Sequence, residues 1–200
     1  MRYLSIDIEA TGLAENCLMI EFAMIPFDAQ TGVLEESLAR TTFIKCPSFE
    51  ELKPTLDPWV VEHNETLIRR AHAEGLPMSE FRQMMTTYLE SPQVKAYFNQ
   101  QKITLFGKSM SAIDLPFMNR DLGWDFMRKY FQHRQLDLSG LCYGLMDLGL
   151  LAPGMESGSA LMRYLGMGTV AHTALEDARN TALMYVKIIE KIKSKAELLR

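Results

Sequence analysis

Residues 4–9 alternate between apolar and polar side chains, which is typical of a β-strand with one buried face. Leu4, Ile6 and Ile8 form the apolar set, and Asp7 and Glu9 belong to the polar set. Residues i and i+2 of a strand point the same way, with Cα atoms roughly 6.5 Å apart. Two carboxylates held that close repel each other unless a cation lies between them. The pattern therefore predicts a first strand whose acidic face needs an explanation.

Two further apolar segments follow early in the chain. Residues 17–27 are apolar apart from Glu21, and the sequence "DAQTG" at 28–32 is typical of a hairpin turn. Residues 36–46 predict a third strand. We therefore expect a meander of three neighbouring strands.

Helical periodicity alternates with short apolar segments in the remainder of the chain. Short helices are expected before residue 77, and a clearer helix over 78–91 with Ser79 as its N-cap. The later segments predict strands at 102–107 and 134–138 and helices at 114–123, 157–166 and 173–195. Meander strands followed by alternating strands and helices predict an α/β fold, a mixed sheet flanked by helices. The length of 200 residues suggests one domain.

Composition narrows the setting of the protein. The net charge of −4 argues against long-range steering by a basic surface, so a polyanionic partner would need a local basic patch or bound cations. Cys17, Cys46 and Cys142 have no metal-ligand spacing, and we expect small buried hydrophobes in a reducing compartment. No apolar segment approaches the ~20 residues of a membrane span, and no leader peptide is expected. The expected location is the cytoplasm, with no membrane partner.

A second acidic group lies in the sequence "HTALEDAR". Thr173 and Glu176 form a capping-box pattern, so a helix is expected to start there. His172 lies just before this helix, and Asp177 lies one turn inside it, on the side that faces the protein. An acid in a first turn also complements the helix dipole, worth about 0.3–1 kcal/mol. The dipole does not account for His172.

Asp114, in "SAIDLPFM", is open to two interpretations. An Asp before Leu-Pro is a good helix N-cap, and it can also face a functional site. Together with Asp7, Glu9 and Asp177 it makes four oxygen donors, which suit Mg²⁺ or Mn²⁺. Two such ions ~3.5–4 Å apart support displacement at phosphorus.

Three segments, "DIEATGL", "SAIDLPFM" and "HTALEDA", resemble the motifs of the DEDDh 3′–5′ exonucleases. This family includes ribonuclease T, oligoribonuclease and the proofreading subunit of bacterial DNA polymerase III. The resemblance implies a ribonuclease H-like fold, an α/β fold with a five-stranded mixed sheet flanked by helices. It also implies that residues 1–200 form a single exonuclease domain.

The resemblance further implies a two-metal-ion hydrolysis that releases 5′-mononucleotides from single-stranded DNA or RNA. Asp7, Glu9, Asp114 and Asp177 would bind two Mg²⁺ or Mn²⁺ ions, and all four are candidate catalytic residues. His172 would be the general base, since its pKa is suited to work near neutral pH.

Residues Thr11, Gly12 and Leu13 would hold the terminal nucleotide, with an apolar wedge against its base. Family members often have "GHN" where this chain has "GKS" at 107–109, so Lys108 is expected to contact a phosphate instead. The sequence "LDLS" at 136–139 is similar to oligoribonuclease and favours short single-stranded substrates. Base stacking is open to four rings: Trp59, His63, Phe117 and Tyr130. Trp59 and Phe117 are equally explained as core residues.

Two other hypotheses remain at this point. One is a catalytically weak nucleic-acid-binding or polymerase-docking module with the same fold, and the other is an endonuclease on that fold. The sequence leaves open the choice of DNA or RNA and the substrate length. It also leaves open a homodimer and a polymerase partner.

Overall fold

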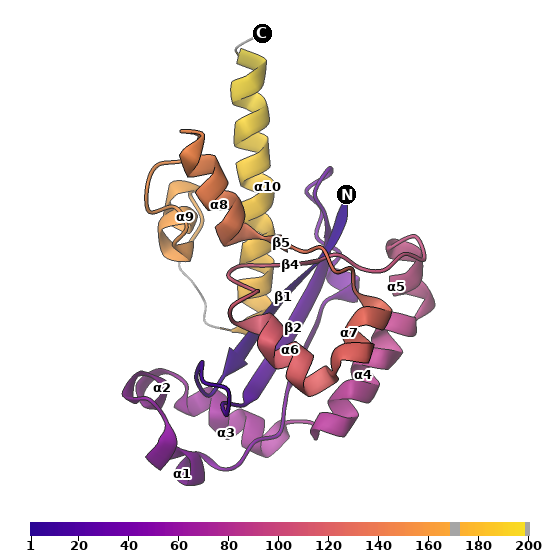
Figure 1. The fold of residues 1–200 in the computed structure, drawn as a ribbon, viewed down its shortest axis with the longest axis vertical. Coiled ribbons are helices and arrows are strands. Elements are labelled where there is room, and N and C mark those ends of the chain that lie inside the picture. The colour runs from indigo at the N-terminus through magenta and orange to yellow at the C-terminus, as the bar shows by residue number, and fades with distance from the viewer. Residues whose placement is uncertain (169–172, 199–200) are drawn as a thin grey trace.

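The computed structural model describes residues 1–168 and 173–198 and has a five-stranded sheet at its centre, in the order β3-β2-β1-β4-β5 (Figure 1). The strands are β1 (Arg2–Ala10), β2 (Met19–Asp28), β3 (Arg40–Phe43), β4 (Leu105–Gly107) and β5 (Leu136–Asp137). β2 is antiparallel to β1 and β3, whereas β4 is parallel to β1 and β5. This confirms the predicted mixed sheet.

Helices cover both faces of this sheet (Figure 1). The helices before β4 are α1 (Phe49–Leu52), α2 (Pro58–His63), α3 (Glu65–Glu74), α4 (Met78–Glu90) and α5 (Pro92–Tyr97). Those after it are α6 (Asp114–Leu122), α7 (Trp124–Tyr130), α8 (Leu138–Asp147), α9 (Gly158–Tyr164) and α10 (Ala174–Leu198). Two 3₁₀ helices, η1 (Glu36–Leu38) and η2 (Lys53–Thr55), lie in the connections.

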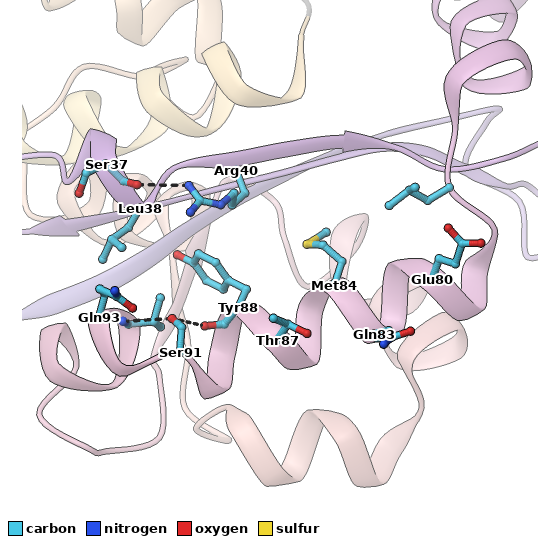
Figure 2. A pocket seen from close by; sticks show the side chains of 12 residues that line it. Ser37, Leu38, Arg40, Glu80, Gln83, Met84, Thr87, Tyr88, Ser91 and Gln93 are labelled. Carbon is cyan, nitrogen blue, oxygen red and sulfur yellow. Dashed lines mark hydrogen bonds between the residues drawn. The ribbon is translucent and has the colours of Figure 1, made fainter.

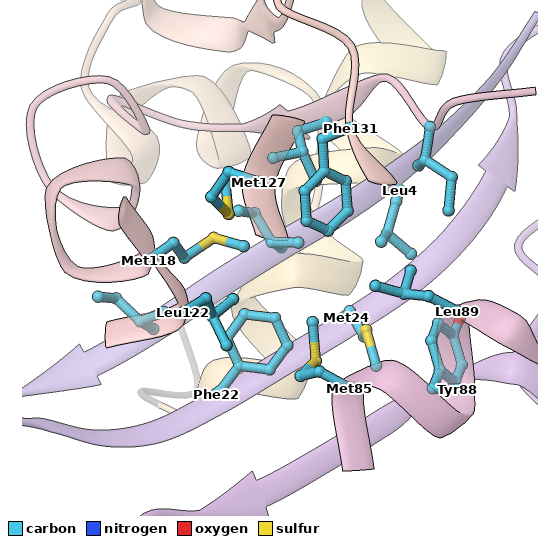
Figure 3. Close-up of a cluster of buried hydrophobic side chains, with 14 of the residues drawn as sticks. Leu4, Phe22, Met24, Met85, Tyr88, Leu89, Met118, Leu122, Met127 and Phe131 are labelled. Atoms are coloured by element: carbon cyan, nitrogen blue, oxygen red, sulfur yellow. The ribbon is translucent and has the colours of Figure 1, made fainter. Parts of the chain in front are cut away.

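The alternation along β1 divides the core in two. The side chains of Leu4, Ile6 and Ile8 face α4, α6 and α7, in a cluster that includes Phe22, Met85, Met118 and Phe131 (Figure 3). On the opposite face, Tyr3 packs with residues of α8, α9 and α10. Ser5, Asp7 and Glu9 share this second face because they are spaced by two residues along the strand. The sheet thus directs its acidic residues toward α10.

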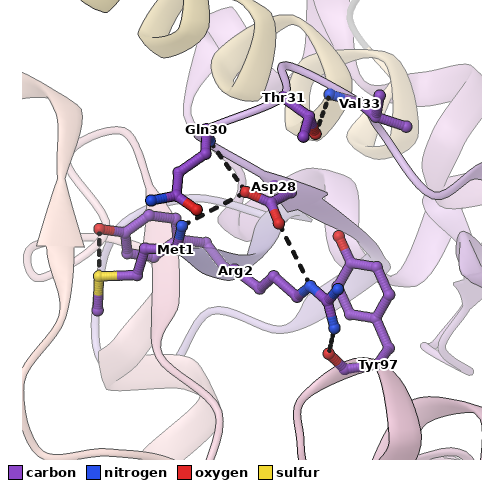
Figure 4. Close-up of polar contacts among 8 residues, drawn as sticks. Met1, Arg2, Asp28, Gln30, Thr31, Val33 and Tyr97 are labelled. Atoms are coloured by element: carbon purple, nitrogen blue, oxygen red, sulfur yellow. Dashed lines mark hydrogen bonds and ion pairs between the residues drawn. The ribbon is translucent and has the colours of Figure 1, made fainter.

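At the end of the β1–β2 ladder where Arg2 pairs with Asp28, the Asp28 side chain forms several polar contacts (Figure 4). Its carboxylate accepts hydrogen bonds from the Met1 amino group and the Arg2 Nε at 3.4 and 3.3 Å. The backbone N–H of Gln30 also donates to Asp28, and this bond is the main reason that the Asp28 pKa is lowered. The surroundings of Asp28 therefore favour its charged form, whereas those of Asp7, in the same ladder, raise the pKa of its carboxyl group.

Some predicted boundaries were wrong. Ser79 is not an N-cap, because α4 begins at Met78 and the carbonyl of Pro77 accepts the first-turn hydrogen bonds from Glu80 and Phe81. The third strand, β3, is shorter than the predicted range 36–46, because the first residues of that range form η1 instead. The strand at 102–107 is paired as β4 only from Leu105 onward.

Two of the three free thiols, Cys46 and Cys142, are buried as predicted, and Cys17 is half-buried. Across residues 1–168 and 173–198, no helix combines the length and the apolar character that a bilayer crossing requires.

Replacing Phe81 by alanine tests the packing beneath the sheet. The Phe81 ring is fully buried and meets the Phe22 ring edge-on, with centroids 5.3 Å apart. We expect Phe81→Ala to lower the free energy of unfolding by about 3–5 kcal/mol, because it removes buried area and leaves a cavity. Urea unfolding followed by circular dichroism measures this. Leu148→Ala, at a side chain that is 73% exposed, should change stability by less than about 0.5 kcal/mol.

Candidate active site

Three carboxylates converge where β1 meets the start of α10. The ligand oxygens of Asp7, Glu9 and Asp177 all lie within 4.8 Å of one another. A buried hydrogen bond from Ser5 Oγ to the carbonyl of Ala178, 2.7 Å long, ties the first turn of α10 to β1. Because Ala178 follows Asp177 directly, this bond fixes the helix at the position where Asp177 reaches the strand.

Asp114 joins the same strand from the opposite direction. It is the first residue of α6 and is buried, and its Oδ1 accepts a hydrogen bond from the backbone N–H of Ile8 at 3.0 Å. The pairing of β1 with β4 covers only Leu4 and Ser5, so β4 does not supply a partner for the Ile8 N–H. The interpretation of Asp114 as the N-cap is therefore wrong, because Ile113 is the N-cap and the Asp114 side chain bonds to β1 instead.

The predicted general base, His172, lies outside the described residues. Thr173 is described, and its carbonyl accepts the backbone N–H of Asp177 at 2.9 Å, so α10 starts where the sequence predicts.

Burial raises the pKa values of Asp7, Glu9 and Asp114, and repulsion by neighbouring carboxylates adds to it. The Asp7 pKa lies well above its usual range, first because of burial and then because of Asp114, Glu9 and Asp177. Burial followed by the charge of Asp177 raises the pKa of Glu9 to about 7. Burial also raises the pKa of Asp114 to about 7, against the opposing effect of its backbone hydrogen bonds. The ionised forms of these carboxylates are therefore unfavourable until a cation balances their charge.

The sequence shows Glu21 as an acid within an apolar strand, but the contacts that Glu21 makes were not predicted from it. Glu21 is buried and lies opposite Glu9 in the β1–β2 ladder. Its Oε1 accepts the Thr41 hydroxyl at 3.1 Å, and its Oε2 accepts the backbone N–H of Ala174 at 3.4 Å. Glu21 therefore links β2, β3 and the first residue of α10 beside the carboxylate cluster.

The loop after β1 has a fixed base and an exposed tip. The backbone N–H of Thr11 donates to the Leu18 carbonyl at 2.9 Å, and the Thr11 hydroxyl accepts from the Leu18 N–H at 2.8 Å. Gly12 has φ +146°, and a Cβ there would lie 2.8 Å from the Cys17 Sγ, so a larger residue would strain the backbone and displace the Cys17 side chain. The side chain of Leu13 is 77% exposed. Contact of this exposed apolar side chain with a substrate base stays a prediction.

Arg120 attaches this loop to α6, a contact that the sequence did not reveal. Its Nη1 donates to the carbonyls of Glu15 and Cys17, both at 2.8 Å. Its guanidinium lies over the Phe117 ring, 4.9 Å from the centroid, and pairs with Asp121. Phe117 is a buried core residue, in line with the second of the two interpretations of this ring.

Lys108 directly follows the last residue of β4. A Cβ on Gly158 would come within 3.2 Å of the Lys108 Cε, so the lysine stem packs against the start of α9. The next residue, Ser109, has a left-handed backbone with φ +55°, and its N–H donates to the Asp137 carboxylate at 3.1 Å. Contact of Lys108 with a substrate phosphate stays a prediction.

An aromatic pair lies on α2. The rings of Trp59 and His63 stack with centroids 4.4 Å apart, and Trp59 is 56% exposed rather than buried in the core. The side chain of Asn64, which follows α2, donates to the carbonyl of Ala10 at 3.2 Å. Because Ala10 ends β1, this bond holds the α2–α3 junction near the carboxylates.

A large cavity of the described residues lies elsewhere on the surface (Figure 2). It has a volume of about 950 Å³ and lies between β3 and α4, and none of the clustered carboxylates lines it. Its wall includes Arg40, whose guanidinium is 5.7 Å from the centroid of the Tyr88 ring. The Tyr88 hydroxyl is buried and has no hydrogen-bond partner among residues 1–168 and 173–198, and burial raises its pKa.

Several solved nuclease structures share this fold. Cell-death related nuclease 4 superposes with a TM-score of 0.66 and 17% identity, over 94% of this chain and 64% of that protein. The nuclease domain of 3′hExo, a DEDDh family member bound to rAMP, gives a TM-score of 0.63 and 13% identity, over 94% and 92%. E. coli exonuclease I in complex with single-stranded DNA gives 0.68 and 18%, over 97% and 41%.

These likenesses show that the chain shares the fold of these nucleases, the α/β fold with a five-stranded mixed sheet that the sequence predicted. The chain spans less than two thirds of cell-death related nuclease 4 and of exonuclease I. No protein-family model and no curated protein sequence matches the chain.

The raised carboxylate pKa values predict how stability varies with pH in the absence of metal. Glu9 has a pKa of about 7 in the fold against an ordinary 4.5, so between these values the folded protein binds more protons than the unfolded chain. The free energy of unfolding should therefore fall as pH rises through this window. Denaturant unfolding in EDTA, from about pH 5 to about pH 8, measures the effect.

Two controls accompany this measurement. Glu9→Gln should flatten the fall, because it removes one of the groups whose pKa is raised. Mg²⁺ or Mn²⁺ should also restore stability at the upper end of the range, because binding to the folded state alone stabilises it. Stability that rises with pH in EDTA would contradict the proposed electrostatics of the cluster.

Proposed function

We propose that this protein is a metal-dependent 3′–5′ exonuclease that releases 5′-mononucleotides from single-stranded DNA or RNA. One observation carries the proposal, the convergence of Asp7, Glu9 and Asp177 within 4.8 Å on a fold shared with solved exonucleases. Asp114, bonded to the same strand, adds a fourth oxygen donor. Structures of this fold that hold rAMP and single-stranded DNA support the class of substrate.

The donor set fits hard divalent cations. All four side chains offer carboxylate oxygens, which suit Mg²⁺ and Mn²⁺ better than thiolate-loving metals. Burial raises the pKa values of Asp7, Glu9 and Asp114, and for Asp7 and Glu9 repulsion by neighbouring carboxylates adds to it, so a bound cation would favour their charged forms. Two ions bound by these residues would supply Lewis-acid stabilisation of the developing charge at phosphorus and a more acidic water.

The remaining residues divide the work of binding and proton transfer. His172, directly before Thr173 and the helix that carries Asp177, would accept the proton of the attacking water on an imidazole nitrogen. Leu13 would pack against the terminal base, and the backbone of Thr11 and Gly12 would hold the terminal nucleotide. The bonds from Arg120 to the loop would keep Leu13 in place while the strand advances.

A 5′-labelled oligonucleotide assay tests this function. Single-stranded DNA and RNA oligomers of several lengths are incubated with Mg²⁺, Mn²⁺ or EDTA. A metal-dependent ladder that shortens from the 3′ end would support the exonuclease, and the better substrate would define its preference. Binding without release of nucleotides would favour the binding or docking module, and cleavage of a circular single strand would favour an endonuclease.

Substitution of the clustered acids should abolish most of the activity. We expect Asp7→Asn and Asp177→Asn each to lower turnover by roughly 10³-fold, because several kcal/mol of charge stabilisation depend on the cations that they would hold. Asp28→Asn is the matched control, since Asp28 lies on the same strand pair but at the opposite end. Steady-state kinetics with circular dichroism spectra of each variant separates loss of turnover from loss of fold.

A separate prediction concerns the general base. His172→Ala should lower turnover by about 10²–10⁴-fold and remove the acidic limb of the pH–rate profile, because the imidazole would have to be neutral to accept a proton. Binding of single-stranded oligonucleotide in EDTA should persist. Turnover close to that of the unmodified protein would exclude His172 as the base.

A further inference from the structure

A second cavity has the chemistry of a nucleic-acid contact, although none of the clustered carboxylates lines it. It has a volume of about 640 Å³ and lies beside β4, α6 and α7. Its floor is apolar and includes Met127 and Phe131, which Figure 3 shows from the core side. Its other lining residues are Lys102, Leu105, Asn119, Trp124, Arg128, Gln132, His133 and Gln135. We call these ten residues the α6–α7 pocket.

The charge of the α6–α7 pocket sets it apart. Lys102 and Arg128 line it, and no carboxylate does. Three other cavities of the described residues each include an acid, namely Glu80, Glu90 or Asp28. Lys102 also lines the cavities that contain Glu90 and Asp28, whereas Arg128 lines the α6–α7 pocket alone of these four. Neither Lys102 nor Arg128 forms an ion pair within residues 1–168 and 173–198, and the Lys102 ammonium donates to the Arg128 carbonyl. In a chain of net charge −4, these neighbouring free cations form a local site for an anion.

Trp124 lies on the wall of this pocket with 62% of its surface exposed. A single exposed aromatic residue is ordinary on a protein surface. Here the indole lies with two cations and with the amides of Asn119 and Gln132, which can bond to phosphates or to base edges. Cations that follow a backbone, together with an aromatic face on which a base stacks, are the means by which proteins bind single-stranded nucleic acid.

Helix α6 connects the pocket to the candidate active site. Asp114 begins the helix at the carboxylates, and Asn119 lines the pocket five residues later, about 7.5 Å along the axis. We infer that the α6–α7 pocket binds the substrate strand on the 5′ side of its terminal nucleotide. A base stacks on Trp124, and phosphates lie against Lys102 and Arg128. This inference rests on the proposed exonuclease function.

Dependence on substrate length tests the inference. The value of kcat/KM is measured with Mg²⁺ for a long single-stranded oligomer and for a dinucleotide, and their ratio gives the preference for length. Trp124→Ala should lower this ratio about tenfold, because only the long strand reaches the indole. Tyr143→Ala, which truncates another exposed aromatic residue on α8, should leave the ratio unchanged. An unchanged ratio in Trp124→Ala would overturn the inference.

The salt dependence of binding tests the two cations. The affinity for the long oligomer is measured in EDTA at several salt concentrations. The double variant Lys102→Ala with Arg128→Ala should make the slope of log K against log salt shallower by about 1.4, because two phosphate contacts are lost. Arg40→Ala with Lys191→Ala removes the same charge elsewhere and should keep the slope. An equal loss of slope in both double variants would indicate only a general charge effect and would overturn the inference.

Binding without catalysis distinguishes the failure of this inference from the failure of the proposed function. Trp59 and Trp124 are the two tryptophans of the chain, so a Trp59→Phe background leaves Trp124 as the indole reporter. Quenching of its fluorescence by the oligomer in EDTA would support the pocket even if no substrate were hydrolysed. Hydrolysis without quenching would support the exonuclease and exclude Trp124 as the stacking residue.

Discussion

Repulsion among crowded, half-buried carboxylates is the constraint on which the candidate site depends. Asp7, Glu9 and Asp177 lie within 4.8 Å of one another, and Asp114 is bonded to the same strand. Burial raises the pKa values of Asp7, Glu9 and Asp114, and for Asp7 and Glu9 this crowding raises the pKa further. Negatively charged carboxylates repel one another, so the free energy that holds them together comes from the rest of the fold.

The two halves of the core supply that free energy. Apolar residues on one face of β1 pack against α4, α6 and α7, while the opposite face packs against α8, α9 and α10. The burial of each large side chain contributes about 1.5–3 kcal/mol. Ser5 and Glu21 then fix the position of α10 against the sheet, since the side chain of each forms a hydrogen bond with a backbone group in the first turns of this helix. Arg120 does the same for the loop that carries Leu13.

Local patterns predicted what depends on local geometry. Asp7 and Glu9 share a face because of the two-residue period of a strand, and the start of α10 follows from the capping pattern at Thr173. The sequence could not show contacts between distant segments, such as the bond from Asp114 to Ile8, because local preference made Asp114 a helix cap. Trp124 was overlooked for a similar reason, since its neighbour in the pocket, Lys102, belongs to another segment of the chain.

The order of the site residues along the chain has a consequence during protein synthesis. Asp7 and Glu9 are synthesised before the helix that carries Asp177, which is the last helix of the described residues. At about 5–20 residues per second, the interval between Glu9 and Asp177 lasts roughly 8–34 s. During that time the nascent chain has only part of its carboxylate set and lacks the cover of α10. Until α10 is synthesised, the complete set of carboxylates cannot assemble.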